Sequence, residues 1–172
     1  MFAGQEISVS LVNVIDENLT QLKMLNNILF SVHFDEKYYA DVVASGELTK
    51  LAYHSDTCVG AISCHRERKE DGAVRLYIMT LGVLEPYRRL GVGTRLMNHM
   101  LDLSSKENMS EVYLHVHTDN EDAINFYKKL GFETTERISN YYRNAIVIKD
   151  YYVLTKRLAV LTKHEAVNTD KK

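Results

Sequence analysis

The chain has 172 residues, of which 45% are hydrophobic and 26% charged, and its formal net charge is −2. This length suits one globular domain with a buried core, and the near-neutral charge excludes a broadly basic nucleic-acid-binding surface. The two cysteines, Cys58 and Cys64, have no metal-site spacing, so we interpret them as reduced core residues. No signal-peptide pattern or apolar segment of membrane-spanning length occurs, so we expect a cytoplasmic protein.

Hydrophobic periodicity in the first part of the chain predicts one strand, two helices and a hairpin. Apolar residues alternate with polar ones at the start, whereas the next segment has an apolar stripe at helical spacing. Asp16 and Asp35 are candidate N-caps for the two helices. The predicted elements are a strand over 6–14, a helix over 19–29, a short helix ending near Gly46, strands over 48–53 and 57–64, and a charged loop over 66–72.

The second part of the chain predicts strands and helices in alternation. A strand, a helix and a strand of these lengths are typical of a parallel, right-handed crossover. Gly131 is placed to end the second helix of this part. The predicted elements are an apolar central strand over 76–83, a helix over 93–106, a strand over 111–117, a helix starting at 120, and strands over 132–138 and 146–158.

The complete order is β-α-α-β-β-β-α-β-α-β-β, without repeats or a linker. It predicts an α/β (α+β) fold with a mixed sheet of seven strands in a single domain over residues 6–158. From Ala159 the sequence becomes polar, so we expect residues 159–172 to form a disordered tail.

A glycine turn after the central strand is the first candidate for a binding site. The stretch from Arg88 to Thr94 reads Arg-Arg-Leu-Gly-Val-Gly-Thr and opens a predicted helix. Unpaired N–H groups and the positive end of a helix dipole attract phosphate, and Gly91 and Gly93 allow close approach to the backbone. The spacing fits neither the dinucleotide fingerprint nor the P-loop. The alternative is a plain basic turn that caps a helix.

Two side chains on neighbouring strands are the candidates for proton transfer. Tyr77 of the central strand and His115 of the next strand can face each other if these strands are parallel and in register. A phenol and an imidazole can pass protons directly or through water. The alternative is a tyrosine and a histidine with only structural contacts. His115 and His117 alone are too few for a metal site.

The turn and the element order resemble the GCN5-related N-acetyltransferase (GNAT) family. The segment from Asn120 to Phe132 is similar to a second signature of that family. The resemblance implies that acetyl-CoA is the co-substrate, with Asn120 at the pantetheine arm and Tyr127 near the sulfur. Both residues also have a plain structural alternative, as a helix cap and a packed side chain. The implied cofactor-binding residues are Leu81, Val83, Arg88, Arg89, Leu90, Gly91, Val92, Gly93, Thr94, Asn120, Ala123, Tyr127 and Lys129.

Four segments, 76–82, 86–94, 113–116 and 140–142, together resemble more closely the NatE-type N-alpha-acetyltransferases, and the similarity extends from about Leu22 to Leu158. The resemblance implies acetylation of protein N-termini that begin with Met and a hydrophobic residue, and water-mediated deprotonation by Tyr77 and His115. It also implies a location in the cytoplasm and nucleus and a complex with the ribosome-associated NatA acetyltransferase. Ser31 and Phe34 depart from the usual Pro and Tyr, which bears on peptide preference. The implied peptide-binding residues are Phe30, Val32, Phe34, Met79, Tyr141 and Tyr142.

The chemistry of an N-terminal amine needs only a weak base. Near pH 7 roughly a tenth of α-amino groups are neutral, against less than about a thousandth of lysine side chains. No cysteine or serine is placed as a nucleophile, so we expect direct transfer. A backbone N–H near Met79 or Leu81 is expected to stabilise the oxyanion, and Tyr127 to protonate the departing thiolate. The alternatives are a lysine acetyltransferase and a non-catalytic, acetyl-CoA-binding partner subunit.

Overall fold

The computed structural model describes residues 5–30, 33–140 and 149–161, and their elements follow the predicted order. The elements are β1 (Ser10–Asn13), α1 (Leu19–Leu29), α2 (Glu36–Ala44), β2 (Thr49–His54), β3 (Thr57–Arg68), β4 (Val74–Val83), α3 (Val92–Lys106), β5 (Glu111–His117), α4 (Glu121–Lys129), β6 (Glu133–Asn140) and β7 (Lys149–Arg157), with single turns of 3₁₀ helix at Gly46–Leu48 and Glu85–Tyr87.

The strands hydrogen-bond in the order β1-β2-β3-β4-β5-β7-β6. β4 and β5 are parallel, whereas β5 and β7 are antiparallel, so the sheet is mixed. The predicted fold class and the parallel crossover are therefore confirmed. The chain divides into two compact units, Met1–His65 with Ile78–Leu103, and Arg66–Tyr77 with Ser104–Lys172.

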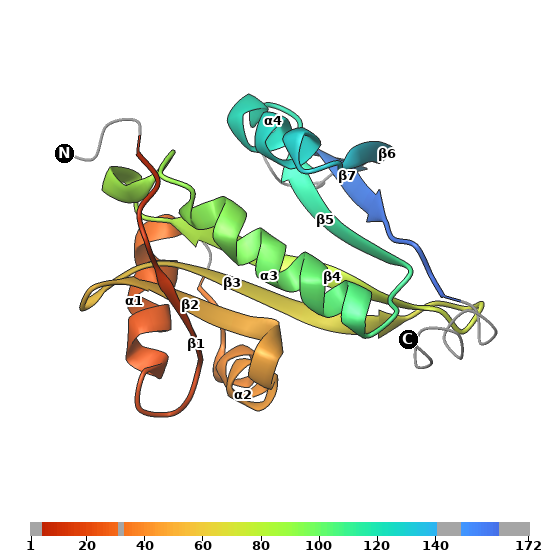
Figure 1. The fold of residues 1–172 in the computed structure, drawn as a ribbon. Helices are drawn as coiled ribbons and strands as arrows, with labels where there is room; N and C mark the ends of the chain where they lie inside the picture. Colours follow the sequence, from red (N-terminus) through yellow and green to blue (C-terminus); the bar gives the residue numbers. More distant parts are fainter. Residues whose placement is uncertain (1–4, 31–32, 141–148, 162–172) are drawn as a thin grey trace, which may run out of the picture. The chain divides into compact units, whose positions relative to one another are not determined.

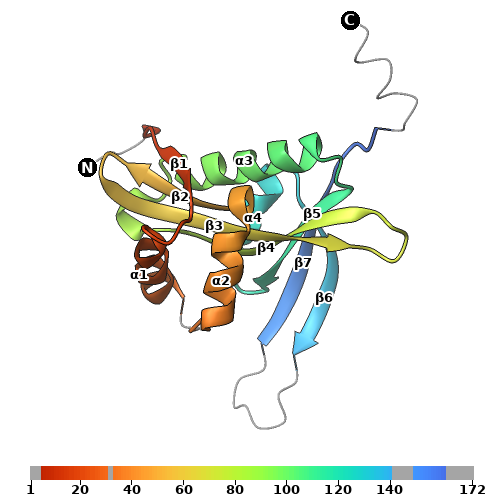
Figure 2. The same ribbon diagram turned by 90° about the horizontal axis from the view of Figure 1, so that it is seen from below.

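In the first unit, helices cover both faces of the strands. Leu22 of α1 and Val42 of α2 belong to a core cluster that includes Leu51 of β2 and Ala61 of β3. The neighbouring Gly60 has no side chain, but a Cβ added to it would point to the opposite face of the sheet and lie 3.5 Å from Cδ1 of Leu96 in α3. Because side chains alternate along a strand, α1 and α2 lie on one face and α3 on the other (Figure 2).

In the second unit, α4 lies beside β5 and β7 (Figure 1). Leu114 and Leu154 are register partners and are both buried. The ammonium group of Lys156 donates to the carbonyl of Leu130 at the end of α4, so the even-numbered side chains of β7 point toward that helix. The odd-numbered side chains of β5 and β7, among them His115, therefore point to the other face.

Two local predictions at helix ends are confirmed. The carboxylate of Asp35 accepts the backbone N–H of Tyr38 at 2.9 Å and caps α2. Gly131 follows α4 with φ of +95°, a conformation in which an L side chain is strained. Cys58 and Cys64 are both unpaired and buried, as expected for core residues.

Two boundaries and one helix cap differ from the prediction. β1 begins only at Ser10, because the N–H of Ile7 donates to the carbonyl of Leu90 instead of to β2. The bounds of α1 match the predicted helix over 19–29, but its N-cap is Asn18 and not Asp16, and the Asn18 side chain accepts the N–H of Ile15 in the preceding turn. The predicted loop over 66–72 begins as the last three residues of β3.

Nothing in the fold tests the extent of the predicted domain over 6–158, which stays a prediction. Residues 162–172 of the predicted polar tail lie outside the described residues. Within the described ranges, no helix is both long enough and apolar enough to cross a lipid bilayer.

Candidate active site

The second unit brings Tyr77 and His115 together as predicted. Tyr77 of β4 is the register partner of Tyr113 in β5, and His115 lies two residues further on the same face. The hydroxyl oxygen of Tyr77 lies 3.0 Å from Nδ1 of His115. A direct hydrogen bond therefore joins a phenol to an imidazole, the two groups predicted to move a proton.

The electrostatic surroundings keep the Tyr77 hydroxyl protonated. Burial raises the pKa of Tyr77 above its usual value, and the negative charge of Glu67 raises this pKa further. A neutral phenol can accept a proton on its oxygen while it donates its own. His115 is exposed on its face of β5, so the pair combines a half-buried tyrosine with an accessible imidazole ring.

His117 is on the same strand but takes no part in this pair. Its ring lies 4.4 Å from the ring of Tyr151 in β7. In the part of the chain that the structure describes, no three His, Cys, Asp or Glu side chains gather as a group that could hold a metal ion.

The glycine turn in the first unit has the backbone geometry of a phosphate site. Arg89 and Gly91 have positive φ, and the N–H of Arg95 donates to the carbonyl of Gly91 to begin the hydrogen bonds of α3. The first N–H groups of any α-helix have no acceptor within that helix, and this holds for the residues that open α3. The dipole of this helix of 15 residues adds partial positive charge at the same end. These features fit the diphosphate of a coenzyme.

Arg88 also braces the turn. Its Nε donates to the carbonyl of Val83 at 2.8 Å, so this guanidinium ties the turn to the end of β4. Gly91 has φ of +86°, at which an L side chain is strained, and a Cβ there would lie 3.3 Å from Cγ of Glu6. The remaining predicted residues of this segment are Leu81, Val83, Leu90, Val92, Gly93 and Thr94, on β4, the turn and the first turn of α3.

The predicted cofactor residues of α4 have visible structural contacts. The side-chain oxygen of Asn120 accepts the N–H of Ala123 at 3.3 Å, which caps the helix. Tyr127 is buried, and its ring packs edge to face with those of Phe126 at 5.1 Å and Phe132 at 5.6 Å. Lys129 is the last residue of α4. The predicted roles of these residues toward acetyl-CoA stay predictions.

Aromatic side chains gather where α1 ends and α2 begins, and Phe30 and Phe34 of the predicted peptide site are among them; their role toward a peptide stays a prediction. The ring of Phe34 lies edge to face with Phe30 at 6.4 Å and stacks on Tyr38 at 4.2 Å. A Cβ on Gly82 of β4 would lie 3.2 Å from Cζ of Phe30, so this strand passes directly beside the cluster. Met79 is on the same strand. Ser31, Val32, Tyr141 and Tyr142 lie outside the described residues.

Two polar contacts next to these residues are not predicted from the sequence. The hydroxyl of Tyr38 lies 2.8 Å from Oγ of Ser63, so the stacking partner of Phe34 is fixed at its far end. In the second unit, Glu67, which the sequence places in a loop, accepts a hydrogen bond from Tyr113. The residues of β3 after Cys64 alternate between more and less exposed positions, and this alternation is the signal that could have placed Glu67 on the strand.

Comparison with known families completes the assignment. Residues 17–132 match the acetyltransferase (GNAT) family. The chain belongs to the GNAT family. The protein is accordingly an acetyltransferase, and its acetyl donor is acetyl-CoA.

Several known GNAT proteins are similar to this chain over most of its length. N-alpha-acetyltransferase 50 of Danio rerio is 47% identical over 87% of this chain and 89% of its own length. The probable N-acetyltransferase san of Drosophila melanogaster is 45% identical over 88% and 82%, respectively. Arabidopsis thaliana Naa50, solved in complex with the bisubstrate analogue CoA-Ac-MVNAL, is 60% identical with a TM-score of 0.80, over 88% of this chain and 100% of that one.

Proposed function

We propose that this GNAT enzyme transfers acetyl from acetyl-CoA to the α-amino group of proteins that begin with Met followed by a hydrophobic residue. The hydrogen bond between Tyr77 and His115 is the observation that carries the proposal. The peptide part of the analogue bound to Arabidopsis Naa50 begins Met-Val, which supports this preference. N-terminal amines are also the easier substrate, since a larger fraction of them is neutral near pH 7.

Acetyl-CoA supplies an activated thioester, and the protein must deprotonate the attacking amine. In our proposal the proton passes through water to the Tyr77 oxygen as the Tyr77 hydroxyl proton moves to Nδ1 of His115. This relay needs the His115 tautomer that carries its proton on Nε2. The raised pKa of Tyr77 supports such a relay, since it favours a hydroxyl over a free phenolate.

The remaining steps are assigned to β4 and α4. A backbone N–H near Met79 or Leu81 would stabilise the oxyanion, and the Tyr127 hydroxyl would protonate the leaving thiolate. Transfer is proposed to be direct. Burial raises the pKa of the Cys58 thiol to about 11 and that of the Cys64 thiol further, so neither is a ready nucleophile.

The peptide-binding residues are proposed to be Phe30, Val32, Phe34, Met79, Tyr141 and Tyr142. The edge-to-face contact of Phe30 and Phe34 supports an apolar pocket for the first side chain. Phe34 offers no hydroxyl to the peptide, a contact whose net contribution is about 1 kcal/mol. A complex with NatA and a location in cytoplasm and nucleus are further proposals from family resemblance.

One acetylation assay tests the proposed function. It uses acetyl-CoA with radiolabelled acetyl and three peptides of equal length, beginning Met-Leu, beginning with an acidic residue, and N-terminally blocked with an internal lysine. We expect the Met-Leu peptide to be acetylated fastest. Preference for the lysine peptide would show a lysine acetyltransferase instead, and binding of acetyl-CoA without transfer to any peptide would show a non-catalytic module.

A further inference from the structure

A third aromatic ring is packed against the pair described above. The ring of Tyr113 lies 4.9 Å from that of Tyr77 and 6.1 Å from that of His115, and the Tyr77 and His115 rings are 5.4 Å apart. The three side chains are therefore in mutual contact on one face of β4 and β5. Any rotation of the Tyr113 ring would change the space available to the Tyr77 ring.

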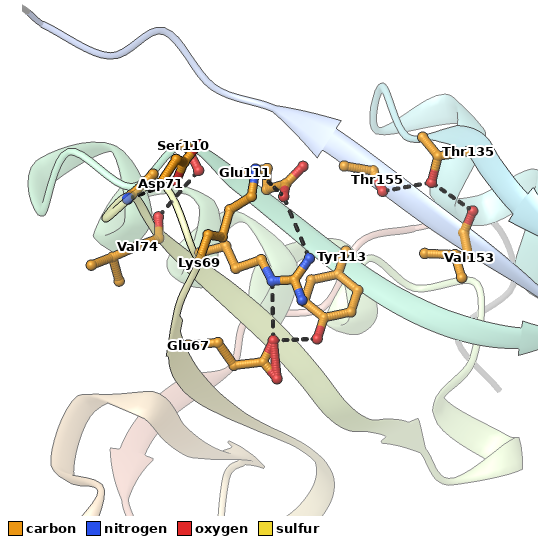
Figure 3. Close-up of polar contacts among 12 residues, drawn as sticks. Glu67, Lys69, Asp71, Val74, Ser110, Glu111, Tyr113, Thr135, Val153 and Thr155 are labelled. Atoms are coloured by element: carbon orange, nitrogen blue, oxygen red, sulfur yellow. Dashed lines mark hydrogen bonds and ion pairs between the residues drawn. The ribbon is translucent and has the colours of Figure 1, made fainter.

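Tyr113 is held at its hydroxyl by a carboxylate. The hydroxyl donates to Oε1 of Glu67 at the end of β3, and Figure 3 shows the two groups pointing toward each other. Nε of Arg75 donates to the same oxygen at 3.1 Å. The Arg75 guanidinium also lies 4.1 Å from the centre of the Tyr113 ring, within the range of a cation–π contact. The phenol is thus fixed at its tip and on its face.

A second carboxylate holds Arg75 in place. Oε1 of Glu111 lies 3.6 Å from Nη1 of Arg75 and 3.3 Å from Nζ of Lys69. Arg75 therefore bridges Glu67 and Glu111 with two different nitrogens, which restricts its rotation. The contacts Glu67–Tyr113, Arg75–Glu67 and Arg75–Glu111 form what we call the Glu67 network.

Hydrophobic packing does not enclose Tyr113 on all sides. Tyr113 and His115 border a pocket of about 320 Å³ that is also lined by Thr135, Val153 and Thr155. Dense side-chain packing usually fixes the rotamer of a buried aromatic residue. Because packing is interrupted at this pocket, the orientation of the Tyr113 ring depends more on the polar contacts of its hydroxyl group.

We propose that Glu67 and Tyr113 are positioning residues for the Tyr77–His115 pair. The inference rests on the proposed function, because it assumes that this pair moves the proton of the substrate amine. Glu67 fixes the Tyr113 hydroxyl, and the Tyr113 ring then supports the Tyr77 ring at the angle that brings its hydroxyl to Nδ1 of His115. The charge of Glu67 also favours the neutral Tyr77 hydroxyl, in agreement with the raised pKa of that residue.

The first test removes the contacts one at a time. Tyr113→Phe keeps the ring and loses the hydroxyl, whereas Glu67→Gln keeps an oxygen acceptor and loses the charge. The matched control is Arg66→Gln. Arg66 precedes Glu67 on β3, and this change breaks its exposed ion pair with Glu107. Initial rates are measured with acetyl-CoA and a Met-Val-Asn-Ala-Leu peptide. We expect kcat to fall about fivefold in both variants, with either KM changed less than about twofold, and Arg66→Gln to behave as wild type.

A double-mutant cycle distinguishes positioning from general loss of structure. If Tyr113 acts through Tyr77, then Tyr113→Phe should lower kcat less than about twofold in a Tyr77→Phe background, since the hydroxyl that it positions is already absent. A full fivefold effect in that background would overturn the proposal. Unchanged kcat in both single variants, or a rise in peptide KM at constant kcat, would overturn it as well.

The same measurements separate this inference from the proposed function. If the wild type does not acetylate the Met-Val-Asn-Ala-Leu peptide, the proposed function is wrong. If Tyr77→Phe and His115→Ala leave kcat unchanged, the role proposed for the pair is wrong and no positioning role remains. If those two variants lower kcat and the Glu67 and Tyr113 variants do not, only the inference is wrong. Thermal unfolding of each variant shows whether it is folded; should Glu67→Gln not fold, Tyr113→Phe alone decides.

Discussion

The hydroxyl oxygen of Tyr77 lies 3.0 Å from Nδ1 of His115, and 38 positions of sequence separate these two residues. The contact exists because the crossover connection from β4 through α3 to β5 makes these two strands parallel neighbours. The in-register pairing of Tyr77 with Tyr113 then places His115 one side-chain repeat further along the same face. The position of the pair is thus a consequence of a crossover that the helical and strand periods of the sequence specify.

Removing either member of the pair should lower turnover. We expect Tyr77→Phe and His115→Ala each to reduce kcat about 10- to 100-fold, at the low end for general acid–base catalysis because part of an N-terminal amine is already neutral. The assay is steady-state acetylation of a Met-Leu peptide between pH 7 and 8. His117→Ala is the control, since its ring packs on Tyr151. Equal kcat in the wild type and both active-site variants would refute the role assigned to the pair.

A pair of glycines tests the phosphate site. Gly91 and Gly72 have nearly the same φ, +86° and +87°, but only Gly91 lies in the turn before α3. Alanine at either position should cost about 1–2 kcal/mol of folding stability, because an L residue is strained at positive φ. At Gly91 the added methyl also meets Glu6, whereas nothing lies within 4 Å of a Cβ on Gly72. We expect Gly91→Ala to weaken acetyl-CoA binding about tenfold, which corresponds to 1.4 kcal/mol.

Calorimetry with acetyl-CoA measures this difference, and thermal unfolding checks that the two alanine variants are similarly destabilised. Gly72→Ala should bind acetyl-CoA like the wild type. If both variants bind acetyl-CoA equally well, the diphosphate does not contact the backbone at Gly91.

Phe34 gives a prediction about peptide affinity. Its ring stacks on Tyr38 at 4.2 Å, and the hydroxyl of Tyr38 is engaged with Ser63, so neither ring offers a free hydroxyl to a peptide. Phe34→Tyr should restore the hydrogen bond that the family resemblance implies. We expect KM for a Met-Leu peptide to fall about fivefold at unchanged kcat, the equivalent of about 1 kcal/mol. An unchanged KM would show that position 34 does not contact the peptide.

The sequence predicted those parts of the fold and candidate site that depend on local pattern. The alternation of side chains predicts Tyr77 and His115 on the same face of neighbouring strands. Asp35 and Gly131 are predicted at helix ends because an N-cap and a residue with positive φ are local requirements. Glu67 could not be assigned in this way. A charged residue near a strand end has no preferred local structure, and its hydrogen bond to Tyr113 depends on a partner 46 positions away. The N-cap of α1 is a similar case, because Asn18 precedes the helix in place of Asp16 and its side chain bonds to the preceding turn.

The acid stability of the first unit should depend on His99 of α3. Burial lowers the pKa of His99, and the positive charge of Lys50 lowers it further; the carboxylate of Glu47 opposes both, and Arg95 adds a smaller lowering effect. Nε2 of His99 lies 3.4 Å from Oε2 of Glu47, but without hydrogen-bond geometry. The folded-state pKa therefore stays below the unfolded value of about 6.5.

The sign of the effect follows from proton uptake. As the pH falls below about 6.5, the unfolded chain takes up a proton at this histidine before the folded chain does, so stability is lost until the folded-state pKa is passed. His99→Gln removes this uptake. We expect its free energy of unfolding, from urea denaturation, to fall less between pH 7.5 and 5.5 than that of the wild type. Asn98→Gln, an exposed neighbour on α3 that does not titrate, is the control. An equal loss in wild type and His99→Gln would mean that His99 takes up its proton equally in the folded and unfolded states.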